Sequence, residues 1–109
     1  MPWLLRDGEV LASLEVAGSR RARRRGLLGR DDIEGALLIE RARSVHTIGM
    51  RFPIDVAWCD ADRTVVRVAR LQRNRVSRPV LRARSVIEAE AGAFARWELT
   101  VGDHLELED

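Results

Sequence analysis

The stretch that decides the fold reads Trp3-Leu-Leu-Arg-Asp-Gly-Glu-Val-Leu-Ala-Ser-Leu-Glu-Val-Ala17. Its centre, Asp7-Gly8, is among the strongest short signals for a two-residue hairpin turn. From Glu9 to Ala17 apolar residues alternate with polar ones, which is the pattern of a strand with one buried face. The stretch therefore predicts an antiparallel pair of strands at residues 3–6 and 9–17.

The rest of the chain alternates short apolar runs with turn signals. Ser19 is typical of a helix N-cap, and the run Arg20 to Leu28 predicts one short arginine-rich helix. A loop is predicted at 72–81, one helical turn at 92–97, and further strands at 36–40, 45–50, 54–59, 64–71, 86–91 and 105–107. These elements predict a mainly β fold, all-β or α+β, built as a β-sandwich, a jelly-roll-like sandwich or a partly open barrel.

Length and composition predict one domain over residues 1–109. Hydrophobic residues make up 46% of the chain and charged residues 33%, a balance typical of a globular protein that needs no metal or disulfide to hold its core. Cys59 is the one cysteine and cannot form an internal disulfide. No apolar run is long enough for a signal-peptide core or a bilayer span, so we expect no membrane association and a cytoplasmic location.

Charge is distributed in blocks. Residues 19–30 carry six arginines and no acid, residues 63–84 carry eight arginines and no acid, and residues 85–109 carry seven acids and Arg96. The blocks either cover one another or leave a basic face for an anionic partner. We expect partial cover, and at most weak, salt-sensitive binding of polyanions. Sequence-specific nucleic-acid binding is not expected, because zinc-finger, phosphate-loop and RNP-type aromatic motifs are missing.

Three stretches carry a resemblance to a known family. They are Arg23-Arg-Arg-Gly-Leu-Leu-Gly-Arg30, Ser44-Val-His-Thr-Ile-Gly-Met-Arg-Phe-Pro-Ile-Asp-Val56, and Val86-Ile-Glu88 with Ala91-Gly-Ala93 and Val101-Gly-Asp103. In order and spacing, nearly the whole chain resembles the bacterial and archaeal family of domain of unknown function 192. The resemblance implies a compact, β-sandwich-like domain with a short helix and no established activity. Relatives often carry a cysteine where this chain has Ala42, which argues against cysteine chemistry here.

His46 is the residue best suited to catalysis. It shares a predicted strand face with Ile48 and Met50, and the strand that carries Asp55 follows at once. A histidine oriented by a carboxylate is a typical general base. The alternative is that His46 packs and hydrogen-bonds a backbone carbonyl, while Asp55 ties down the loop after Pro53.

Candidate ligand-binding residues come from the arginine-rich helix and the histidine segment. Guanidinium groups bind phosphates and carboxylates in bidentate fashion, although a solvated helix face would have the same composition. The candidates are Arg23, Arg25, Arg30, His46, Thr47 and Met50. The available soft metal ligands, His46, His104 and Cys59, lack the spacing of a metal motif, so neither a metal nor a cofactor is predicted.

The preferred interpretation is a small, non-catalytic β domain that binds an anionic ligand or a protein partner. One alternative is a small enzyme that uses His46 and Asp55. Another is a structural component of a larger assembly. An enzyme should show His46 lining a pocket with a carboxylate and an oxyanion or substrate donor nearby. A binding domain should show a basic or apolar surface patch without a deep cleft, and an assembly component should expose a large apolar patch or an open sheet edge.

Overall fold

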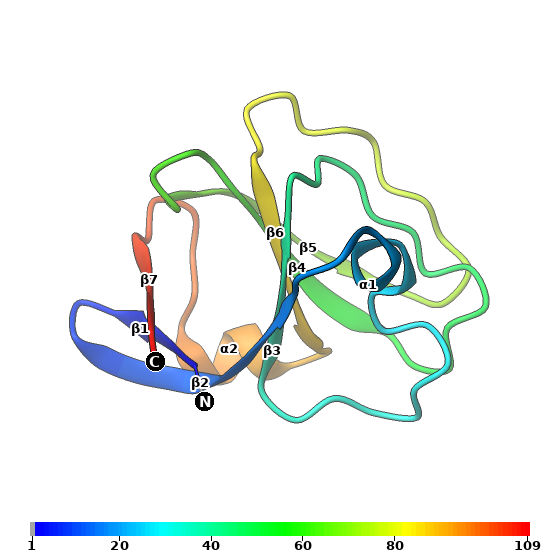
Figure 1. Ribbon diagram of the computed structural model, residues 1–109, viewed down its shortest axis with the longest axis horizontal. Helices are drawn as coiled ribbons and strands as arrows, with labels where there is room; N and C mark the ends of the chain where they lie inside the picture. Colours follow the sequence, from blue (N-terminus) through cyan, green and yellow to red (C-terminus); the bar gives the residue numbers. More distant parts are fainter. Residues whose placement is uncertain (1) are drawn as a thin grey trace.

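The computed structural model describes residues 2–109. Its strands form one sheet of order β5-β4-β6-β3-β2-β1-β7, which does not close into a barrel (Figure 1). The strands are β1 Trp3–Arg6, β2 Glu9–Ala17, β3 Ala36–Glu40, β4 Ile54–Cys59, β5 Val65–Leu71, β6 Ser85–Glu90 and β7 Leu105–Glu108; the helices are α1 Arg20–Arg25 and α2 Ala93–Trp97. The prediction of a mainly β fold with a short arginine-rich helix is confirmed.

The β1–β2 hairpin forms where the sequence predicts it. Arg6 faces Glu9 in the ladder, and the two turn residues between them, Asp7 and Gly8, have φ of 52° and 78°. Positive φ at both positions is the requirement of the type I′ turn, which aspartate and glycine tolerate best. β2 then changes partner along its length, from antiparallel pairing with β1 to parallel pairing with β3. Because β2 and β3 run parallel, the chain must cross over between them, and α1 lies in that crossover.

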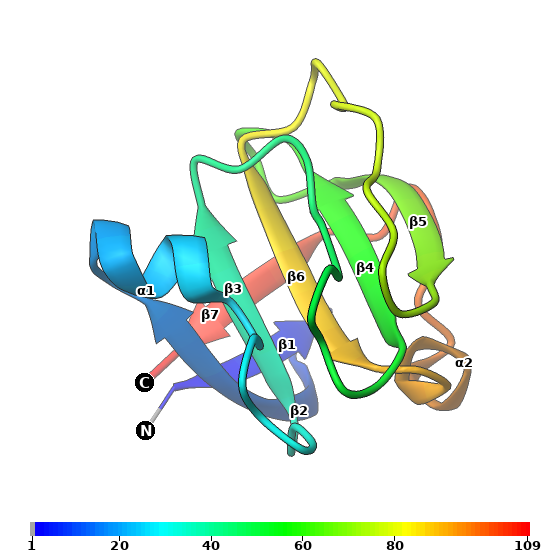
Figure 2. The same ribbon diagram turned by 90° about the vertical axis from the view of Figure 1, so that its right-hand side faces the viewer.

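The sheet curls so that β1 and β7 lie behind the central strands (Figure 2). Between these layers lies a first core, which α2 also covers. A second core lies on the opposite face, beneath α1 and the loops on either side of β4 and β5. The first core includes Leu4, Leu14, Leu38, Ile87, Phe94 and Leu105, and the second includes Leu27, Ile39, Met50, Val56, Trp58 and Val86.

The prediction of a strand at residues 45–50 is wrong. The segment is a loop with a single bridge, between His46 and Val76, and Thr47 anchors it to the loop that follows β5. The buried Thr47 hydroxyl donates to the Gln72 carbonyl at 2.6 Å and accepts from the Arg75 N–H at 2.9 Å. Val45 and Met50 pack against the second core, whereas Ile48 is exposed, so the burial of this loop does not follow the alternation of a strand.

Candidate functional site

The candidate site begins at α1, whose ends are set by local sequence. Ser19 caps the first turn, because its Oγ accepts a hydrogen bond from the Ala22 N–H at 3.0 Å. The helix ends at Arg25 instead of reaching residue 28, because Gly26 adopts φ 51° and ψ −125°, a conformation that favours glycine. A Cβ atom on Gly26 would also lie 3.4 Å from Oε1 of Glu88 on β6. This distance is an ordinary van der Waals contact, so the backbone conformation is what favours glycine at the end of α1.

The loop that carries His46 forms the opposite wall of the site. Val45 and Thr47 are buried on either side of His46, whereas the His46 side chain is exposed. Within residues 2–109 the imidazole ring makes no hydrogen bond, so the alternative of a packed, carbonyl-bonded histidine does not describe it. The expected common face of His46, Ile48 and Met50 is also wrong, since only Met50 of the three is buried. The loop thus holds His46 in position through its neighbours.

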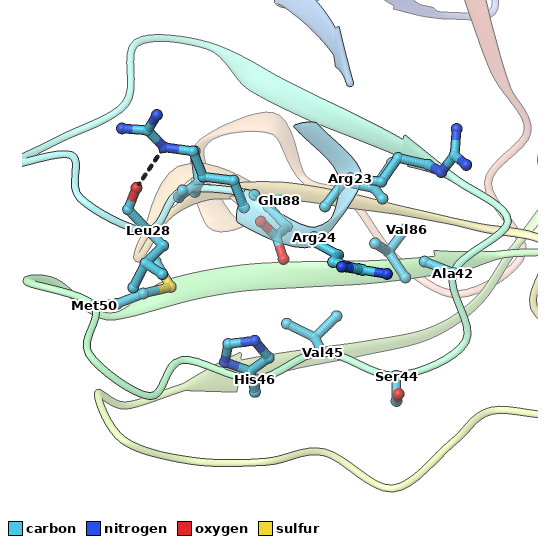
Figure 3. Close-up of a pocket in the computed structure, with 14 residues that line it drawn as sticks. Arg23, Arg24, Leu28, Ala42, Ser44, Val45, His46, Met50, Val86 and Glu88 are labelled. Carbon is cyan, nitrogen blue, oxygen red and sulfur yellow. Dashed lines mark hydrogen bonds between the residues drawn. The ribbon is translucent and has the colours of Figure 1, made fainter. Parts of the chain in front are cut away.

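Between α1 and this loop lies a cavity of about 70 Å³. That volume is enough for a few water molecules or a small organic group. Arginines of α1 and His46 lie on its rim, and apolar side chains from β3, β6 and the loop form its walls (Figure 3). The lining residues are Arg23, Arg24, Arg25, Gly26, Leu27, Leu28, Ile39, Ala42, Ser44, Val45, His46, Met50, Val86 and Glu88.

Glu88 is the acidic group of this cavity. Its side chain is only 4% exposed, yet it has no hydrogen-bond or ion-pair partner among residues 2–109. Figure 3 shows the carboxylate directed into the space between α1 and His46. Burial raises the pKa of the Glu88 carboxyl to about 7 from an ordinary value of 4.5, because the charged form loses its hydration. An unpaired buried carboxyl group that borders a cavity is a typical feature of a functional site.

The arginines of α1 are also unpaired. Of the helix arginines, Arg25 donates from Nε to the Leu28 carbonyl at 3.2 Å, and none forms an ion pair within the described part of the chain. Among residues 2–109, no acid of the segment 98–109 forms an ion pair with them. Its Asp103 pairs with Arg6 at 2.9 Å, between β1 and the loop before β7, on the other side of the sheet from α1.

The structure separates the two residues of the predicted catalytic pair. His46 lines the cavity on the second-core face, whereas Asp55 borders a groove on the first-core face beside α2. Asp55 accepts hydrogen bonds from Arg70 Nε at 3.0 Å and from the backbone N–H groups of Gly92 and Phe94 at 2.9 and 3.2 Å. Asp55 therefore joins β5 to the start of α2 and does not orient His46.

The other sequence candidates divide between the cavity and the scaffold. Arg23, Arg25 and Met50 line the cavity with His46, whereas Thr47 acts as the buried anchor of the loop. Arg30 forms a bidentate pair with Glu15, with both N–O distances 2.8 Å. Sequence reasoning did not select Glu88 as a site residue. Its one signal was an acid placed on the same strand face as the apolar Val86.

Cys59 is the one thiol of the chain. Cys59 is fully buried in the first core, and burial raises the pKa of its thiol to about 12, which suppresses the reactive thiolate. Within residues 2–109, no three histidine, cysteine, aspartate or glutamate side chains gather as metal ligands. No helix in the same residues is long and apolar enough to cross a bilayer.

Two solved bacterial structures resemble the fold over 96% of this chain. One is a protein of unknown function from Novosphingobium aromaticivorans, with a TM-score of 0.79, 18% identity and 82% of that protein covered. Another, from Sinorhizobium meliloti, is described as a candidate transcription regulator and has a TM-score of 0.77, 21% identity and 90% coverage. At these identities the likeness concerns the fold alone. No curated protein matches the sequence significantly.

The family assignment covers the hairpin, the arginine-rich helix, the histidine loop and β6. Residues 4–107 match the model of domain of unknown function 192, described as an uncharacterized ACR. The match includes all the residues that line the cavity. The chain therefore belongs to the domain of unknown function 192 family.

Proposed function

We propose that this domain binds a small anionic ligand in the cavity between α1 and the His46 loop. The observation that carries the proposal is that one cavity is bordered by arginines without ion-pair partners, and by a buried carboxyl group without any partner, among residues 2–109. Arg23 and Arg24 would bind the anionic group of the ligand at the rim, since guanidinium groups suit carboxylates and phosphates. The cavity volume of about 70 Å³ favours a small molecule over a segment of a protein partner.

The apolar walls limit what can enter more deeply. Leu27, Val45, Met50 and Val86 surround the interior and offer no hydrogen bonds from their side chains. A ligand with a short hydrocarbon portion would bury apolar surface there, at roughly 25 cal/mol for each square ångström removed from water. The ligand class that fits is therefore a small organic acid, with its charge at the rim and its carbon chain inside.

The test is a calorimetric and thermal-shift screen with acetate, propionate, butyrate and inorganic phosphate. Saturable binding should raise the melting temperature by mass action. The variant R23Q/R24Q should lose this binding, whereas R20Q/R21Q, which removes the same charge from helix positions outside the cavity, should retain it. Absence of saturable binding by any of these anions, or an equal loss in both variants, would contradict the proposal.

A second candidate function is acid–base catalysis by His46 and Glu88. It is favoured by their presence on one cavity and by the raised pKa of Glu88, since a group that titrates near neutral pH can both accept and donate protons. Incubation of the protein with each ligand that binds, followed by proton NMR, separates the two functions. An unchanged ligand spectrum supports binding alone, and a new set of resonances supports catalysis.

A further inference from the structure

The cavity is lined by ionisable side chains of opposite charge. The interior holds the Glu88 carboxyl group, which apolar walls surround. Arg23, Arg24, Arg25 and His46 also line the cavity. Figure 3 shows the Arg24 guanidinium near the space between Glu88 and His46, and the Arg23 guanidinium directed away from it. A ligand that carries only an anion would satisfy the arginines and leave Glu88 unpaired. To pair with Glu88, the inner end of the ligand must carry a hydrogen-bond donor. A cationic donor pairs most favourably with an ionised carboxyl group.

A ligand ammonium group would remove the cost of the unpaired carboxylate. A buried charge is tolerated when an opposite charge and hydrogen bonds accompany it, and it is strongly unfavourable when it stands alone. Within residues 2–109 no arginine pairs with Glu88, although three line the same cavity. A ligand with an ammonium group on a short carbon chain is small enough for the cavity volume of about 70 Å³. A ligand that carries a guanidinium group is larger and fits this volume less well.

We propose that the ligand is a small amino carboxylate, whose ammonium group binds the Glu88 carboxylate inside the cavity while its own carboxylate binds Arg23 and Arg24 at the rim. This inference rests on the proposed function and adds the inner group to it. Both ends of the ligand then meet a side chain of opposite charge, and its short carbon chain lies against Leu27, Val45 and Met50. The number of carbons between the two charges must match the separation of Glu88 from the arginines.

The test compares β-alanine and 4-aminobutyrate with propionate, butyrate and butylamine by titration calorimetry at pH 8. At that pH Glu88, with a pKa of about 7, is largely ionised and aliphatic amines remain protonated. We expect the better amino acid to bind at least tenfold more tightly than the acid and the amine of the same chain length. Glu88→Gln should lower its affinity to that of the matched acid. Glu90→Gln, which removes an exposed carboxylate from the same strand, should leave the affinity unchanged.

The possible outcomes separate this inference from the proposed function. Equal binding of amino acids and matched acids would overturn the amino-carboxylate assignment and leave the anion-binding function intact. Failure of all of these compounds to bind would overturn both. Tighter binding of the amino acid that persists in Glu88→Gln would also refute the inference, because the ammonium group would then bind elsewhere. Circular dichroism of each variant confirms that it has folded before its affinity is compared.

Discussion

Replacing Glu88 with glutamine should change how the stability of the protein depends on pH. In the unfolded chain this carboxyl ionises near 4.5, whereas in the fold its pKa is about 7. Between these values the native state holds the proton more strongly than the unfolded state, so the free energy of unfolding falls as pH rises. The stabilisation is fully present below about pH 4.5 and is lost as pH passes through about 7. Each pKa unit corresponds to about 1.4 kcal/mol, so the whole effect amounts to roughly 3 kcal/mol.

The measurement is urea unfolding followed by circular dichroism at pH 5 and pH 8. From pH 5 to pH 8, the free energy of unfolding of the wild-type protein should fall by roughly 2.5 kcal/mol more than that of Glu88→Gln. The other titratable or charged side chains that line the cavity are the three arginines of α1 and His46. The arginines keep their charge throughout this pH range.

Glu90→Gln is the matched control for this experiment. Glu90 lies two residues further along β6, is exposed, and pairs with Arg96 at 2.6 Å. Removal of its charge should leave the pH dependence near that of the wild type, because surface ion pairs contribute little. If Glu88→Gln and the wild type show the same change in stability between pH 5 and pH 8, the reasoning from burial is wrong.

Three further substitutions test the residues around the cavity. Gly26→Ala should destabilise the protein by about 1–3 kcal/mol in urea unfolding, because Gly26 has a positive φ that strains any residue with a Cβ atom. Gly18→Ala, at a site with no atom within 4 Å of the added group, is its control, and an equal loss in both would count against the argument. Thr47→Val should cost about 1–3 kcal/mol, since it removes both hydrogen bonds that the buried hydroxyl makes to the loop after β5. His46→Ala should change stability by less than about 0.5 kcal/mol, and a loss as large as that of Thr47→Val would restore a structural role for the histidine.

Sequence by itself determined the elements whose signals are local. The hairpin is specified by Asp7-Gly8 and by the alternation in the strand that follows, because the turn geometry and the strand register are set within about fifteen residues. The N-cap of α1 follows from Ser19 in the same way. The strands at β3, β4, β5 and β6 were predicted within about one residue at each end, because each is a short apolar run between turn signals.

Only the tertiary structure decided which segments meet. The insertion of β6 between β3 and β4, and the parallel pairing of β2 with β3, join residues far apart in the chain, and no local pattern encodes such choices. The segment at 45–50 is a loop whose burial does not follow the alternation of a strand, because contacts with the second core decide which of its residues are buried. His46 and Asp55 lie in consecutive segments of the sequence, but they face cavities on opposite sides of the sheet. Glu88 acquires its raised pKa, and its place in the cavity, from apolar side chains that three distant segments bring together, so its environment exists only in the folded protein.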